Sequence, residues 1–223
     1  MLQKKDMAHY AASKPMDKPP RKKWKYTSGP TNILSRMLRH AIDNDELYWK
    51  FPSQELFERL GMTSAVFETD KSGTFVGSSG VLASGQDWAR FGQLYLDHGK
   101  WNGEQLLPLK WVKEARRSTH GSRKKYGAHW WLSSRKSRPD LPNDSYSAEG
   151  FQGQLLLIAP SQCAVIVRLG QTPKRGGFDK NAFGAQVLLA LRRGKPEKFR
   201  CQPRRTSHKH RNKEGEAKKS RDS

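Results

Sequence analysis

The chain has 223 residues, 35% of them hydrophobic and 28% charged, which suffices for one sizeable core or two small ones. It has no run of 18 apolar residues, and its first residues are rich in Lys and Pro, so we expect neither a transmembrane helix nor a signal peptide, with the cytoplasm as the default location. Two cysteines are too few for a disulfide framework or a CxxC zinc site, and no glycine-rich nucleotide loop occurs. We therefore expect no metal and no cofactor.

The net charge is +21, and its placement is informative. Residues 192–223 hold 13 Lys and Arg against 4 Asp and Glu, so residues 1–191 still carry +12. A surface this basic attracts phosphate polyanions without sequence preference, although a solvated surface is the simpler interpretation. Residues 192–223 are poor in apolar side chains, which predicts a disordered basic tail that binds polyanions weakly and non-specifically.

The first half of the chain is predicted to be mostly helical. Residues 1–23 are polar and rich in Lys and Pro, and we expect a mobile basic segment there. Behind Pro30, apolar residues recur at helical spacing to Ile42, which predicts an amphipathic helix capped by Thr31 or Asn32. A second, short helix is predicted from Ser53, as its cap, to Gly61.

The stretch 63–83 lacks a helical period and predicts extended chain and loops. Ser84 and Asp87 then have capping-box spacing at the start of a helix, and a short helix follows Pro108. Strands are predicted at 126–132, 154–160 and 164–170, the last two joined in a hairpin. A closing helix at 179–193 completes an α+β fold.

Three stretches carry a family resemblance in their order and separation: WKYTSGPTNILSRML (24–38), ASGQDWARFGQLYLDHGKWNGEQLLPLKWV (83–112) and GFQGQLLLIAPSQCAVIVRLG (150–170). Together they resemble serine hydrolases of the β-lactamase and penicillin-binding-protein superfamily, most closely the class C-like branch of esterases and 6-aminohexanoate-dimer hydrolases. The resemblance implies a partial β-lactamase-like fold: a helical region followed by C-terminal antiparallel strands and a closing helix. The hydrolase domain would span residues 24–191 and lack an N-terminal segment.

The active site of this superfamily is built from three short sequence motifs, here called boxes, and Tyr26-Thr27-Ser28 matches the second of them. By the resemblance, Tyr26 would relay a proton between nucleophile, base and leaving group, and Ser28 would hydrogen-bond the substrate or the base. A tyrosine hydroxyl can do this when a neighbouring cation lowers its pKa from about 10. The alternative is that Tyr26 only packs, since Tyr-x-Ser is a common triplet.

The third box corresponds to Gly150-Phe151-Gln152-Gly153-Gln154, ahead of an apolar strand. Glycines at a strand end let a substrate approach the backbone, which can offer an N–H to an oxyanion. We therefore assign Gly150, Phe151, Gly153 and Gln154 to substrate binding. Phe151 stands where the family often has Lys or His, which favours neutral esters and amides over anionic β-lactams.

The first family box, Ser-x-x-Lys, supplies the nucleophile and its base. In the family it precedes the tyrosine box by a long stretch, whereas this sequence has only 25 residues ahead of Tyr26. Two such strings occur, Ser122 to Lys125 and Ser133 to Lys136, and about two are expected by chance from the composition. Both follow Tyr26, outside a helix start, so we reject both. The Lys-Ser-Gly at 71–73 is likewise treated as a coincidence.

Two functions of different class follow. The first is a serine hydrolase acting on small amide or ester substrates through an acyl-enzyme, inactive as this chain because its nucleophile box is absent. The alternative is a non-enzymatic basic protein that binds nucleic acid non-specifically, although no nucleic-acid fold signature occurs. If strands are missing, the strand at 164–170 would present an unpaired apolar edge, through which we expect self-association.

Overall fold

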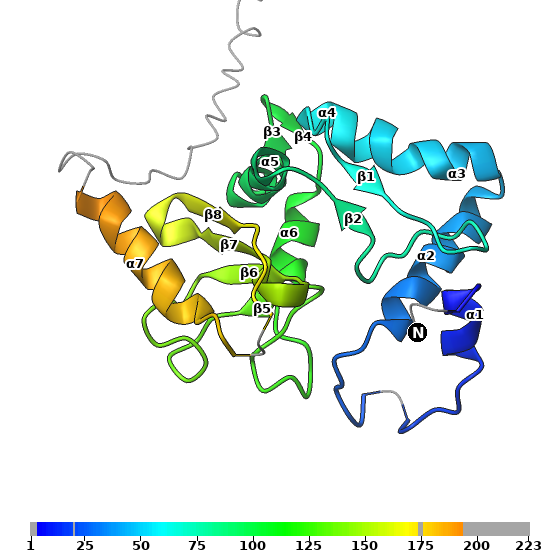
Figure 1. Ribbon diagram of the computed structural model, residues 1–223, viewed down its shortest axis with the longest axis horizontal. Coiled ribbons are helices and arrows are strands. Elements are labelled where there is room, and N and C mark those ends of the chain that lie inside the picture. Colours follow the sequence, from blue (N-terminus) through cyan, green and yellow to red (C-terminus); the bar gives the residue numbers. More distant parts are fainter. Residues whose placement is uncertain (1–3, 20, 174–175, 194–223) are drawn as a thin grey trace, which may run out of the picture.

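The protein consists of a helical part and an antiparallel sheet, which Figure 1 shows side by side. The computed structural model describes residues 4–19, 21–173 and 176–193. Its elements in chain order are α1 Met7–Ala12, α2 Gly29–Ile42, α3 Asp45–Pro52, α4 Glu58–Leu60, β1 Val66–Phe67, β2 Val81–Leu82, α5 Gly85–Leu96, β3 Lys100–Trp101, β4 Glu104–Gln105, α6 Leu109–Ala115, β5 Trp131–Leu132, β6 Tyr146–Glu149, β7 Leu155–Ala159, β8 Ala164–Arg168 and α7 Lys180–Arg193.

The stretch 1–23, predicted as a mobile segment, contains the short helix α1. Asp6 caps this helix by accepting a hydrogen bond from the His9 N–H at 2.8 Å. Met7 is buried, and its N–H donates to the Asp70 carboxylate at 2.8 Å. This long-range hydrogen bond ties α1 to the 70–74 loop, a contact that local sequence patterns do not reveal.

The two predicted N-terminal helices exist with different starts. Helix α2 begins at Gly29, with Pro30 in its first turn. It ends before Asp43, whose backbone is in the left-handed conformation. The helix expected to be capped by Ser53 is in fact capped nine residues earlier, because the Asn44 side chain accepts from the Leu47 N–H at 2.9 Å at the start of α3. A π-helical turn at Ser53–Phe57 connects α3 to α4.

Helix α5 starts as the capping-box spacing predicts, with one change of partner. The Ser84 hydroxyl accepts from the Asp87 N–H at 3.2 Å. The Asp87 carboxylate, instead of returning to Ser84, accepts from the N–H and the hydroxyl of Ser64 at 2.8 and 2.6 Å. Ser64 in turn accepts from the Ser84 N–H at 2.9 Å, so the cap joins α5 to the chain before β1.

The main sheet has the strand order β5-β6-β7-β8, all antiparallel. Strands β7 and β8 confirm the predictions at 154–160 and 164–170. The strand predicted at 126–132 is wrong over most of its length, because His129 is left-handed and the Gly127 N–H donates to the Trp130 carbonyl at 2.8 Å, closing a turn. Strand β6 was not predicted.

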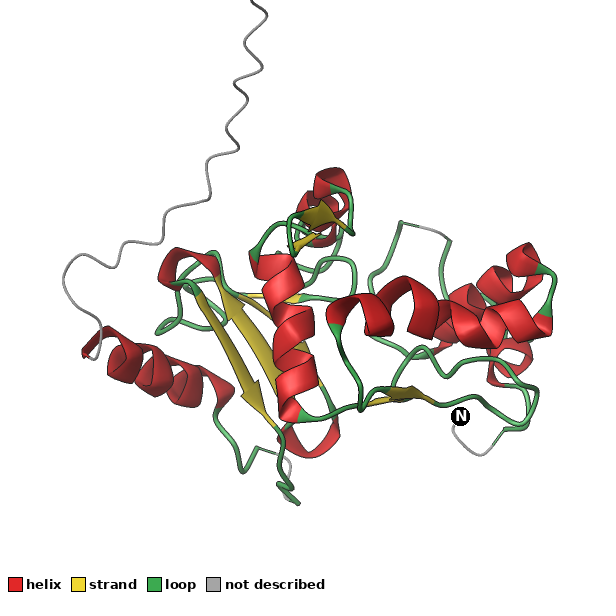
Figure 2. Ribbon diagram, turned by 90° about the horizontal axis from the view of Figure 1, so that it is seen from above, coloured by secondary structure: helices red, strands yellow, loops and turns green. Residues whose placement is uncertain are grey.

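The sheet is covered on both faces, as Figure 2 shows. One face packs its side chains, including Leu156 and Ile158, against α5 and α6. The other packs Leu155 and Leu157 against α7, through Leu188. Strand β7 is therefore buried on both faces, which explains its uninterrupted apolar sequence.

Strand β8 is the last strand of this sheet within the described residues, as predicted for the strand at 164–170. The tail predicted at 192–223 lies outside the described residues, except for Arg192 and Arg193 at the end of α7. Among the described helices, none combines the length and the apolar character that a membrane span requires.

Candidate functional site

Tyr26 lies in an aromatic cluster that joins the loop before α2 to the sheet. Its ring centroid is 5.0 Å from that of Trp131 on β5 and 5.6 Å from that of Tyr126. Trp24 packs against the same two rings, at 6.5 and 5.5 Å. The Tyr26 side chain is nevertheless 56% exposed, so the cluster fixes its ring while leaving it open to a ligand.

The neighbouring Tyr126 is more buried than Tyr26. Burial, with a smaller contribution from Tyr26, raises the pKa of Tyr126 to about 12. Tyr126 is therefore harder to ionise than an ordinary tyrosine. Its position suits it to hold the Tyr26 ring, a role that sequence reasoning missed because the aromatic run at 126–131 was interpreted as a strand.

Ser28 is exposed at the start of α2. Its carbonyl accepts the Asn32 N–H at 3.3 Å, but its hydroxyl makes no capping hydrogen bond. The hydroxyl is thus not committed to the helix that it precedes. Since Tyr26 is two residues away, both polar groups of the predicted second box come from one short exposed segment.

The predicted third box forms a tight turn after β6. Gly150 is extended, and its N–H donates to the Gln154 carbonyl at 3.0 Å, so any N–H offered to an oxyanion must come from elsewhere in the turn. Phe151 is 86% exposed at the tip. Gln152 and Gly153 both have positive φ, 56° and 85°, a conformation that only Gly adopts without strain.

Gly153 is held by Arg168, at the end of β8. The Arg168 guanidinium donates to the Gly153 carbonyl at 2.8 Å and to the Thr172 hydroxyl at 2.9 Å, and it stacks 3.9 Å from the centroid of the Phe178 ring. A Cβ on Gly153 would lie 2.8 Å from an Arg168 nitrogen. The glycine therefore permits this close approach as well as the backbone conformation.

The side chain of Gln154 is fully engaged with the protein backbone. Its amide nitrogen donates to the Gly170 carbonyl at 2.6 Å, and its amide oxygen accepts from the Gly170 N–H at 2.9 Å. These two hydrogen bonds continue the pairing of β7 with β8 beyond the strand ends. In this conformation Gln154 supports the turn, and its side chain does not point a free amide toward a substrate.

A partly buried ion-pair network borders the other end of the turn. Glu149, the last residue of β6, pairs with Arg138 and with Lys180 of α7. Ser147 joins the network by accepting from Arg138 at 2.8 Å and donating to Glu149 at 3.0 Å. The turn is thus anchored on one side by the ion pairs of Glu149 and on the other by Arg168 and Gln154. A hydropathy pattern could not identify any of these contacts.

The serines of the two rejected strings lie in the interior. Ser122 is buried, and its hydroxyl donates to the Tyr126 carbonyl at 3.2 Å. Ser133 is also buried, and its hydroxyl has no partner among the described residues. Ser72, in the Lys-Ser-Gly string, donates to the Asp70 carboxylate at 2.6 Å. No nucleophile–base pair is formed by these three serines in the part of the chain described.

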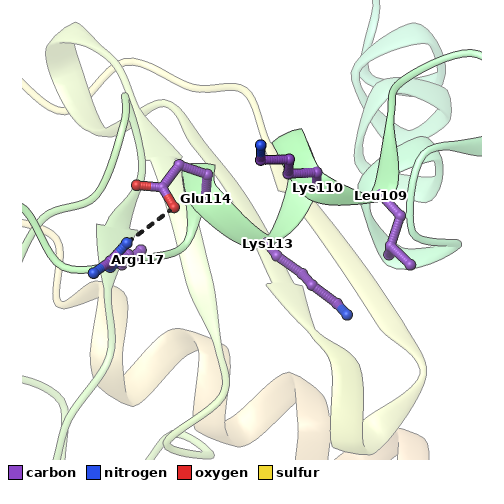
Figure 3. A pocket seen from close by; sticks show the side chains of 5 residues that line it. All are labelled: Leu109, Lys110, Lys113, Glu114 and Arg117. Carbon is purple, nitrogen blue, oxygen red and sulfur yellow. Dashed lines mark hydrogen bonds and ion pairs between the residues drawn. The ribbon is translucent and has the colours of Figure 1, made fainter.

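A basic hollow of about 490 Å³ lies along α6, and none of the three serines lines it. Figure 3 shows its lining, with Glu114 ion-paired to Arg117 at 3.4 Å. The lining residues are Leu109, Lys110, Lys113, Glu114 and Arg117. Groups of three or more potential metal ligands are absent from the described ranges.

The family model described as Beta-lactamase matches residues 1–191. The chain belongs to the β-lactamase family. The match includes residues 1–23, which were predicted to precede the domain. A search of curated proteins gave no significant match.

Solved structures of the same fold include three informative ones. A proposed 6-aminohexanoate-dimer hydrolase from Bacillus anthracis has a TM-score of 0.66 at 23% identity, over 83% of this chain and 47% of that one. A proposed β-lactamase from Bacteroides dorei has a TM-score of 0.57 at 17% identity, over 83% and 63%. A β-lactamase from Mycobacterium bovis has a TM-score of 0.62 at 13% identity, over 83% and 72%. The β-lactamase-like fold is therefore present in part, since the chain spans about half the length of the first.

Proposed function

We propose that this chain carries the tyrosine side and the strand side of a serine-hydrolase site acting on amide or ester bonds through an acyl-enzyme. Tyr26 transfers the proton, Ser28 binds the substrate or the base, and the turn from Gly150 to Gln154 holds the substrate at the end of β6. The observation that supports it most is the placement of an exposed Tyr26 on Trp131, in the strand next to β6.

The nucleophile and its base are supplied by a segment outside this sequence. Acyl transfer needs a nucleophile within hydrogen-bond reach of its base, and Ser122 and Ser133 are buried without one. The chain alone is therefore inactive toward esters and amides. The 6-aminohexanoate dimer is a reasonable amide to test, given the name of the Bacillus anthracis neighbour.

The test is reconstruction of the missing side. The segment of a relative that carries Ser-x-x-Lys is fused to the chain, and hydrolysis of p-nitrophenyl esters and labelling by a fluorophosphonate probe are measured. The fusion should gain both activities, and Tyr26→Phe should lower kcat by roughly 10² to 10⁴ because it removes the proton-transfer group. Tyr126→Phe is the matched control, since its ring stays and its hydroxyl takes no part. Equal effects of both variants would return Tyr26 to a packing role, and labelling of the unfused chain at Ser122 or Ser133 would contradict the assignment.

The basic hollow on α6 favours a second candidate function, non-specific binding of nucleic acid. Lys110, Lys113 and Arg117 line it, against the single carboxylate of Glu114. Fluorescence anisotropy with a labelled DNA duplex should then show an affinity that falls steeply with salt, and replacing the two lysines by Gln should reduce the salt dependence by about two phosphate contacts. An unchanged slope would exclude this surface as the binding site.

A further inference from the structure

Helix α2 turns its polar face toward the protein and its apolar face toward solvent, the opposite of a typical surface helix. Its polar residues Asn32, Arg36 and Arg39 face the protein, whereas Leu34, Met37, Leu38 and Ala41 are exposed. The exposed residues recur at i, i+3, i+4 and i+7, so they form one continuous apolar stripe along about 10 Å of helix. A surface helix normally buries such a stripe, so its exposure needs an explanation.

The inward polar face is well satisfied, so the orientation of α2 is fixed by specific contacts. The Asn32 amide oxygen accepts from the Ser78 N–H at 3.2 Å, and Arg36 donates to the Thr74 hydroxyl at 3.2 Å. Gly77 allows the 74–78 loop to approach so closely that a Cβ there would lie 2.4 Å from the Ser35 hydroxyl oxygen. Rotating the stripe inward would break these contacts.

We infer that the apolar stripe of α2, defined as Leu34, Met37, Leu38 and Ala41, is the docking surface for a helix from the part of the β-lactamase-like fold that lies outside this sequence. The lengths of the relatives favour this occupant: the shared fold covers 83% of this chain but 47%, 63% and 72% of the three neighbours, so each neighbour contains further residues beyond the common part. The inference rests on the proposed function only in that the same segment brings the nucleophile.

The position of the stripe relates it to the candidate site. Leu34 lies five residues beyond Gly29, about 8 Å along the helix axis from its first residue, and Tyr26 precedes α2 by three residues. A helix seated on the stripe therefore ends or passes beside the segment that carries Tyr26 and Ser28.

Two exposed methionines provide a built-in assay. Met37, within the stripe, is 60% exposed, and Met16, in the loop after α1, is 72% exposed. Oxidation by hydrogen peroxide follows exposure, so both should react at similar rates in the chain alone. The probes are two fusions of the full chain, each to the part of the Bacillus anthracis or Mycobacterium bovis relative that lies outside the match. Peptide mass spectrometry then gives the rate of sulfoxide formation at each methionine.

In at least one fusion Met37 should be oxidised roughly 10-fold more slowly, with Met16 unchanged, since covalent linkage keeps even weak docking saturated. Leu34→Asp in the fusion should restore the fast rate. Leu189→Asp is the matched control, because Leu189 is similarly exposed (49% against 54%) but lies on α7. Fast Met37 oxidation in both fusions would overturn the inference.

Two further outcomes separate the alternatives. If Met37 in the unfused chain becomes protected as the concentration rises, a second copy covers the stripe and the proposed occupant is wrong. If Met37 is protected in a fusion that no fluorophosphonate labels, the docking surface stands and the proposed function falls.

Discussion

Replacing Gln154 by Ala should destabilise the fold and not simply weaken substrate binding. The substitution removes both hydrogen bonds between the Gln154 amide and the Gly170 backbone. Each contributes about 0.5–1.5 kcal/mol net, so the expected loss is roughly 1–3 kcal/mol. For a chain of this size each kcal/mol lowers the melting temperature by about 2–4 °C, which gives a decrease of roughly 2–12 °C.

The decrease is measured by circular dichroism during thermal unfolding, with urea unfolding as an independent check. Gln171→Ala is the matched control, because Gln171 is exposed next to Gly170 and its loss should change stability by less than about 0.5 kcal/mol. If Gln154→Ala has the same melting temperature as the wild type, the two hydrogen bonds to Gly170 contribute nothing to the stability of the fold. A Gln154→Ala fusion with an unchanged melting temperature and a raised KM would instead show that Gln154 contacts substrate, as the sequence resemblance implied.

Gly92→Ala should destabilise the fold by about 1–3 kcal/mol through overpacking, because its Cβ would lie 2.5 Å from Val165, and the better helix propensity of Ala offsets at most about 1 kcal/mol of this. Gly85→Ala in the same helix is the control: its Cβ would have its nearest neighbour at 3.9 Å, so it should be neutral or stabilising. Equal melting temperatures of the two variants would refute the contact. The pKa of Asp87 is held below its usual range, chiefly by the hydrogen bond from the Ser64 hydroxyl, so its ionised form stabilises the fold above about pH 3.9 and this stability is lost as pH falls through the lower folded pKa. Between about pH 5 and pH 2.5 the melting temperature should therefore fall more in the wild type than in Asp87→Asn, and parallel curves would contradict this. Because β8 ends the sheet within the described residues, sedimentation velocity should show larger species as the concentration rises, whereas a monodisperse monomer would argue against an open edge.

The strands show where sequence patterns suffice and where they fail. Strands β7 and β8 could be predicted because both are short apolar runs joined by a turn; β7 is buried at every residue, whereas β8 is only partly buried. Strand β6 could not, since its Ser147 is buried through hydrogen bonds to Arg138, in the loop between β5 and β6, and to Glu149 at the strand end. A polar residue gives no sign in the sequence that a partner will satisfy it.

Helix α2 shows a second limit. The spacing of its apolar residues predicts a helix with two faces, and the helix is present. Which face turns inward depends on the neighbours, and the 70–78 loop supplies polar partners in Thr74 and Ser78. The apolar face stays exposed in this chain and would be covered only by the docking segment inferred above, so the apolar spacing predicts the helix but not which face is buried.

The surroundings of Phe151 bear on which substrates the site could accept. The cations that border its turn already have partners: Arg138 and Lys180 pair with Glu149, and Arg168 donates to Gly153 and Thr172. An anionic substrate at the tip would have to replace one of these contacts and leave a partly buried carboxylate or carbonyl unpaired, which costs up to about 1–3 kcal/mol. Phe151 itself offers an exposed apolar ring that gains from covering an apolar acyl or amine chain. These contacts support the proposal that the site accepts neutral esters and amides in preference to carboxylate-bearing β-lactams.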